Sequence, residues 1–114
     1  DIVLQSIAQT VLSCVRKTDA VIRYGGDEFV IIFFNIPQDI FGKKLERIRN
    51  SVDSLIIDDH PELHMSVSIG GAYGIGTIKK LFKAADNMMY QSKKAKNQVT
   101  IYYFDRNEDN TDNI

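Results

Sequence analysis

Tyr24-Gly25-Gly26-Asp27-Glu28-Phe29 is the stretch that decides the fold, because it joins two apolar runs through a pair of glycines. The runs cover residues 20–24 and 29–34, and both are rich in the β-branched and aromatic residues typical of strands. A Gly-Gly pair between two such runs predicts a tight β-hairpin with two to four residues in its turn. The sequence therefore predicts an antiparallel strand pair over residues 20–34.

The tip of this hairpin carries residues that suit a phosphate ligand. Glycine lets a ligand approach the backbone closely. Asp27 and Glu28 add two carboxylates, whose oxygens are ligands that Mg²⁺ prefers. The turn alone leaves an alternative open, since Gly and Asp are also common in ordinary solvated turns. The turn taken by itself favours that ordinary role.

The remaining chain alternates helical and strand patterns. Apolar spacing predicts helices over residues 1–17, from Pro37 onward and after Thr77, where Thr77 is the cap, and strands over 65–70 and 99–104. We expect a flexible glycine-rich connection at 70–76 and a disordered acidic tail at 105–114. The inward positions expected in the helices are Leu4, Ile7, Ala8, Val11, Leu12 and Val15, then Phe41, Leu45, Ile48, Val52 and Leu55, then Ile78, Leu81, Phe82, Ala85 and Met89. The element order is therefore α, β, β, α, β, α, β.

Composition excludes several classes of protein. The 114 residues are enough for one domain, and 44% are hydrophobic, which is ordinary for a globular chain. A net charge of −1 gives no basic excess that would suggest nucleic-acid binding. No apolar run approaches the length of a membrane span, so we expect no membrane contact by this segment. The single Cys14 cannot form an internal disulfide, and we expect a cytoplasmic setting.

Several motifs together resemble one known family. The stretch Arg23–Phe29 resembles the signature of the GGDEF domains, the diguanylate cyclases, and the other motifs follow in the order of that family. They are Arg16-Lys17-Thr18-Asp19, Glu46-Arg47-Ile48-Arg49, Val67-Ser68-Ile69-Gly70 and Ala85-Asp86-Asn87-Met88-Met89-Tyr90-Gln91-Ser92-Lys93. The resemblance covers residues 1–104 and implies an α/β palm-type sandwich, with a mixed, mainly antiparallel sheet and helices packed on it.

The resemblance also implies that the domain is partial. Family members open with one more strand and helix, so we expect residues 1–104 to lack the opening strand and helix of the fold. That strand would lie between strands 29–34 and 65–70 and would carry another metal-binding aspartate. We therefore expect the fragment alone to be inactive and the gap in the sheet to be filled by other residues. An upstream sensory domain is expected in the full-length protein, which could be anchored in a membrane.

The implied activity is condensation of two GTP molecules into cyclic di-GMP by a homodimer with Mg²⁺ or Mn²⁺. By resemblance Asp27 is a catalytic residue and metal ligand, and Glu28 is a second catalytic residue. The implied substrate-binding residues are Gly25, Gly26, Asp1, Lys93 and Lys96. The lysine segment departs from the family pattern, because it lacks a glycine and is one residue shorter. The alternative is an inactive GGDEF domain that senses GTP or cyclic di-GMP or only dimerises.

A separate inhibitory product site is implied by Arg16 and Asp19, with Arg47 as its third member. The planar fork of arginine suits bidentate binding of phosphate or guanine acceptors. The alternative is an exposed ion pair between residues three apart on a helix end, worth only about 0.5 kcal/mol. Next to the signature, the spacing favours a ligand site.

Overall fold

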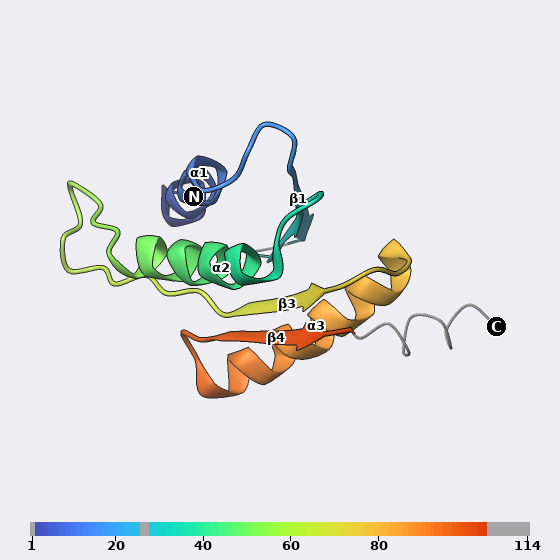
Figure 1. Ribbon diagram of the computed structural model, residues 1–114. Coiled ribbons are helices and arrows are strands. Elements are labelled where there is room, and N and C mark those ends of the chain that lie inside the picture. The colour runs from blue at the N-terminus through green and yellow to red at the C-terminus, as the bar shows by residue number, and fades with distance from the viewer. Residues whose placement is uncertain (1, 26–27, 105–114) are drawn as a thin grey trace. The chain divides into compact units, whose positions relative to one another are not determined.

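The computed structural model describes residues 2–25 and 28–104 (Figure 1). Its elements are α1 (Ile2–Ser13), β1 (Ala20–Gly25), β2 (Glu28–Ile32), α2 (Gln38–Asp53), β3 (Ile69–Tyr73), α3 (Ile78–Ala95) and β4 (Val99–Tyr103). This order confirms the predicted one. The chain divides into two compact units, Asp1–Met65 and Ser66–Ile114, and each is described by itself. The predicted disordered tail at 105–114 lies outside the described residues.

The first unit contains the predicted hairpin. β1 pairs with β2 in antiparallel register, from Ala20 opposite Ile32 to Gly25 opposite Glu28. An irregularity between Arg23 and Gly25 shifts the register before the turn. β1 ends at Gly25 and β2 begins at Glu28, so the pairing continues to the facing ends of both strands. The hairpin prediction is confirmed.

The helices of the first unit differ from their prediction at the ends. α1 stops at Ser13 rather than residue 17, and the Cys14 amide bonds to the Val11 carbonyl at 3.0 Å in a tighter turn. Leu12 is 56% exposed, so its predicted inward position is wrong, whereas Val11 and Cys14 are buried beside α2. α2 begins after Pro37, which is its N-cap.

The core stripe of α2 is confirmed for four positions. The buried residues on the helix are Phe41, Leu45, Ile48 and Val52. Leu55 follows the end of the helix and is only half-buried. Phe33, just after β2, packs edge-on against Phe41 with ring centroids 5.9 Å apart. This ring contact joins the end of the hairpin to α2.

The second unit corrects the prediction for residues 65–76. β3 begins at Ile69, not at residue 65, and runs through Gly70 and Gly71, which we expected in a flexible connection. The strand is set by parallel pairing with β4, from Ile69 opposite Val99 to Tyr73 opposite Tyr103. A side chain at Gly70 would overlap the backbone of α3, so this glycine permits close packing of helix on strand.

α3 covers one face of the β3–β4 pair (Figure 1). Thr77 caps it as predicted, since its hydroxyl accepts from the Lys80 amide at 3.2 Å. Ile78 is 66% exposed, so its predicted inward position is wrong, because the first turn of α3 extends past the end of β3. Ser92 is fully buried and bonds to the Ile69 carbonyl at 2.8 Å and the Thr100 hydroxyl at 2.6 Å.

The described strands thus form one antiparallel pair and one parallel pair with helices packed on them, which is an α/β fold with mixed pairing. The predicted position of a further strand next to β2 and β3 stays a prediction. Within residues 2–25 and 28–104, no helix is both long enough and apolar enough to cross a membrane.

Candidate functional site

The signature contains the two predicted catalytic carboxylates, and the structure places one of them. Glu28 is the first residue of β2, is half-buried and lies opposite Gly25. Asp27, Gly26 and Asp1 lie outside the described residues. The Glu28 carboxylate is a hard oxygen donor of the kind that Mg²⁺ binds. Within the described part of the chain no three His, Cys, Asp or Glu residues gather into a group that could hold a metal ion.

The predicted phosphate-binding lysines lie at the C-terminal end of α3, in the second unit. Lys93 is exposed in the last turn of the helix. Lys96 caps the helix, donating its amide to the Ser92 carbonyl at 2.8 Å. Lys96 has φ of +62° and Asn97 has φ of +46°, a region that favours glycine. The chain therefore makes the turn at the end of α3 without the glycine usual in the family.

Arg16 and Asp19 form a closed turn after α1. The Arg16 amide donates to Asp19 Oδ2 at 2.7 Å, and the Asp19 amide donates to the Arg16 carbonyl at 3.0 Å. The guanidinium of Arg16 donates to the same carboxylate, with Nη2 2.8 Å from Oδ1 and Nε 3.2 Å from both oxygens. Nη2 also donates to the carbonyl of Phe34 at 2.7 Å. The predicted pair is thus a bidentate contact anchored to the end of the hairpin.

The two charged side chains of this turn differ in how far they are buried. The Asp19 side chain is fully covered, whereas the Arg16 side chain is 41% exposed. The hydrogen bond from Arg16 holds the pKa of Asp19 below its ordinary value, and the nearby Lys44 charge acts in the same direction. The hydrogen bond to Asp19 raises the pKa of Arg16. Both groups are therefore ionised at neutral pH.

Arg16 retains donors for a ligand. A guanidinium has five N–H groups. Nε–H and the two hydrogens of Nη2 bond to Asp19 and Phe34. Among the described residues nothing accepts from Nη1, so its two N–H groups can bond to a phosphate oxygen or a guanine acceptor.

Arg47, the predicted third member, is exposed on α2. It borders a hollow of about 620 Å³ along the helix; the other lining residues are Gly42, Lys43, Glu46, Asn50, Ser51 and Ser54. No hydrogen bond or ion pair joins Arg47 to Arg16 or Asp19 within residues 2–25 and 28–104. The structure therefore brings two of the three predicted residues together.

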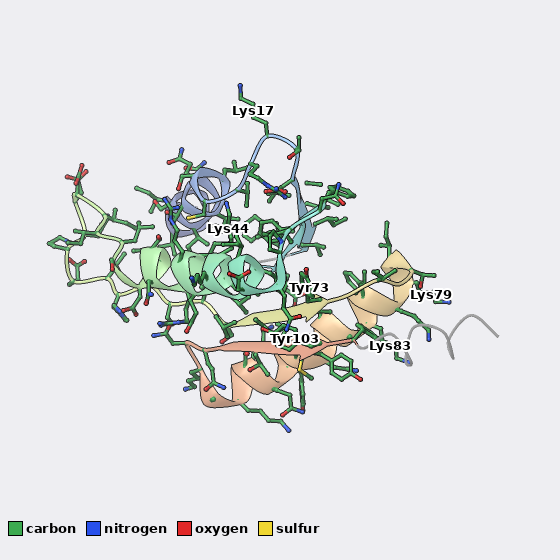
Figure 2. The ribbon with its side chains drawn as sticks, viewed as in Figure 1. Lys17, Lys44, Tyr73, Lys79, Lys83 and Tyr103 are labelled. Carbon is green, nitrogen blue, oxygen red and sulfur yellow. The ribbon has the colours of Figure 1, made fainter. Side chains whose placement is uncertain are left out.

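Lys44 is a residue of this region that the sequence interpretation missed. Its Nζ donates to the Cys14 carbonyl at 2.9 Å, just before Arg16. Figure 2 shows Lys44 rising from α2 toward the end of α1, while Lys17 points away from the fold. Its bond joins residues 30 positions apart, so no local pattern in the sequence could have indicated it.

Comparisons with known proteins give one consistent result. The family model described as "Diguanylate cyclase, GGDEF domain" matches residues 1–99. The chain is 34% identical over 106 residues to diguanylate cyclase A of Treponema denticola, covering 89% of this chain and 29% of that protein. It is 38% identical over 93 residues to diguanylate cyclase DgcM of Escherichia coli K12, covering 82% of this chain and 23% of that protein.

Comparison with solved structures points to the same family. The GGDEF domain of DgcB from Caulobacter crescentus, in complex with c-di-GMP, matches with a TM-score of 0.78 at 28% identity, covering 88% of this chain and 63% of that one. The predicted α/β fold class is therefore confirmed. The chain spans less than a third of the length of the two curated relatives.

Proposed function

This chain belongs to the GGDEF family of diguanylate cyclases, and we propose that it is part of an enzyme that condenses two GTP molecules into cyclic di-GMP. The observation that carries the proposal is the intact signature, which joins two strands that pair with each other up to Gly25 and Glu28. Two glycines and two carboxylates between paired strands suit a triphosphate and its cation.

In the proposed reaction, the 3′-hydroxyl of each GTP attacks the α-phosphorus of the other. Two new O–P bonds form, two bonds to pyrophosphate break, and each hydroxyl proton passes to a base. Asp27 is the proposed base and metal ligand, with Glu28 beside it. Bound Mg²⁺ or Mn²⁺ would neutralise phosphate charge. Gly25 and Gly26 would let the nucleotide lie against the backbone.

Other residues bind the rest of the substrate in this proposal. Lys93 and Lys96 would contact the terminal phosphates as cations, and Asp1 would accept from the guanine edge. Two copies must face each other, because each round of synthesis joins two GTP molecules, so the active form is a homodimer. Since GTP is a cytoplasmic nucleotide, we place the domain in the cytoplasm, joined to an upstream sensory domain.

Product control is the second part of the proposal. Arg16, Asp19 and Arg47 would bind cyclic di-GMP at a site separate from Asp27 and inhibit turnover. The support is the two Nη1 donors that Arg16 retains beside a covered carboxylate.

The test is synthesis by the full-length protein. It is incubated with GTP and Mg²⁺, and cyclic di-GMP is measured by chromatography. We expect product from the wild type, loss of at least about 100-fold in rate for Asp27→Asn and Glu28→Gln, and no loss for Asp59→Asn, which changes an exposed loop carboxylate. A wild type that binds cyclic di-GMP but makes none would contradict the enzyme and favour a sensing module. Full activity in Asp27→Asn would overturn the assigned site.

A further inference from the structure

The side chain of Lys44, on α2, bonds to the backbone just after the C-terminal end of α1. α1 ends at Ser13, and backbone amides within a helix cannot satisfy its last four carbonyls. The Lys44 ammonium donates to the carbonyl of Cys14 at 2.9 Å, across 30 positions of the chain. A cation at this end also complements the negative end of the helix dipole.

The same ammonium acts on the covered carboxylate of the next turn. Lys44 is among the charges that favour the ionised form of Asp19. Asp19 in turn holds the guanidinium of Arg16 through two nitrogens. Lys44 therefore supports both the backbone that enters the turn and the acidic partner that orients the arginine.

From these contacts we infer that Lys44 is a positioning residue for the Arg16–Asp19 turn, and that it sets the affinity of this turn for cyclic di-GMP without touching the ligand. The inference rests on the proposed function of the turn as a product site. Lys44 is half-buried and its ammonium bonds to the backbone, so it holds the turn in place before a ligand arrives. Such preorganisation lowers the ordering cost of binding.

The chain offers a matched control in Lys17. It lies inside the turn, between Arg16 and Asp19, carries the same charge and is exposed. Its side chain points away from the fold in Figure 2, and within the described residues it makes no hydrogen bond or ion pair. Loss of charge at Lys17 thus tests general electrostatics, whereas loss at Lys44 tests the bond to Cys14.

The experiment compares the full-length wild type with Lys44→Met, Lys44→Arg and Lys17→Met. Binding of cyclic di-GMP is measured by calorimetry, and initial GTP turnover is measured without added product. We expect Lys44→Met to bind about tenfold more weakly, the scale of one charged hydrogen bond, with its initial rate unchanged. Lys44→Arg can still reach the carbonyl and should recover most of the affinity, and Lys17→Met should stay within about twofold of wild type.

Several outcomes would overturn the inference. Wild-type affinity in Lys44→Met would do so, as would equal losses in Lys44→Met and Lys17→Met, or equal losses in Lys44→Met and Lys44→Arg. If Lys44→Met melts below the assay temperature, Lys44→Gln takes its place, with the same expected loss. A wild type that binds cyclic di-GMP but makes none would instead remove the proposed enzyme and leave the role of Lys44 to be judged by the binding data.

Discussion

Replacing Gly70 by alanine should strongly destabilise the unit formed by β3, α3 and β4. A Cβ built at Gly70 lies 2.5 Å from Met89 Cα and also overlaps Met89 N and Ala85 O. All three atoms belong to the backbone of α3, so no side chain can rotate away. The methyl group fits only if the helix moves off the strand.

The size of the effect follows from that movement. Carbon atoms attract best at about 3.5–4.0 Å, so α3 must retreat by about 1 Å or more. Overpacking of a core costs about 1–3 kcal/mol, occasionally more. Because the clash is with helix backbone, we expect the upper end, about 3 kcal/mol, against a typical total stability of about 5–15 kcal/mol.

Urea unfolding followed by circular dichroism measures the change, with Gly76→Ala as the matched control. Gly76 is exposed, lies in the connection before α3 and has no positive φ, so its substitution should change stability by less than about 0.5 kcal/mol. If Gly70→Ala unfolds at the same urea concentration as Gly76→Ala, the close approach of α3 to β3 does not limit stability and the reasoning is refuted.

Three further outcomes are expected. Gly74→Ala should lower the melting temperature, since Gly74 has φ of +148° and a Cβ there would lie 2.7 Å from Phe104 Cβ; an unchanged melt would contradict this. Ser92→Ala should cost about 1–3 kcal/mol in urea unfolding, because the buried hydroxyl bonds to Ile69; a wild-type midpoint would show the bond to be dispensable. Acid should unfold the wild type partly through Asp19: its folded pKa lies below the ordinary 3.8, so the stability it adds is present above that value and is lost as the pH falls through the folded pKa. Asp19→Asn should show a shallower loss of stability over that acidic range, and equal slopes would refute the assignment.

The features that the sequence predicts well are local ones. The hairpin depends on two strand patterns and the glycines between them, and the register with Gly25 opposite Glu28 confirms it. The cap at Thr77 depends on one hydroxyl three residues before the amide of Lys80. The stripe of α2 depends on helical spacing alone. Each of these is decided within a few residues of the chain.

The features that the sequence predicts poorly depend on residues far away along the chain. Gly70 and Gly71 resemble a connection by composition, but their strand is set by pairing with β4, about 30 positions later. The exposure of Ile78 depends on where β3 ends under α3, which helical spacing does not contain. In both cases tertiary contacts override the local pattern.

The same division applies to the candidate site. The contact between Arg16 and Asp19 is the ion pair that the sequence offered as the alternative to a ligand site, and it is local because the two residues are three positions apart. The bond from Lys44 to Cys14 requires the end of α1 to meet the side of α2, and no local pattern encodes that meeting. Asp27 belongs to the signature motif but lies outside the described residues, so its role stays a proposal.

The Arg16 contacts also show why arginine, rather than lysine, suits this position. The group must hold a carboxylate and a carbonyl of Phe34 at once and still present donors outward. A guanidinium does so because its five N–H groups point along fixed directions in one plane. An ammonium has three donors and no fixed plane, so bonds to Asp19 and Phe34 would leave little for a ligand. The i,i+3 ion pair that would be unremarkable on any helix end therefore becomes a candidate site through the donors it leaves over, and it is these donors that a phosphate-bearing ligand can use.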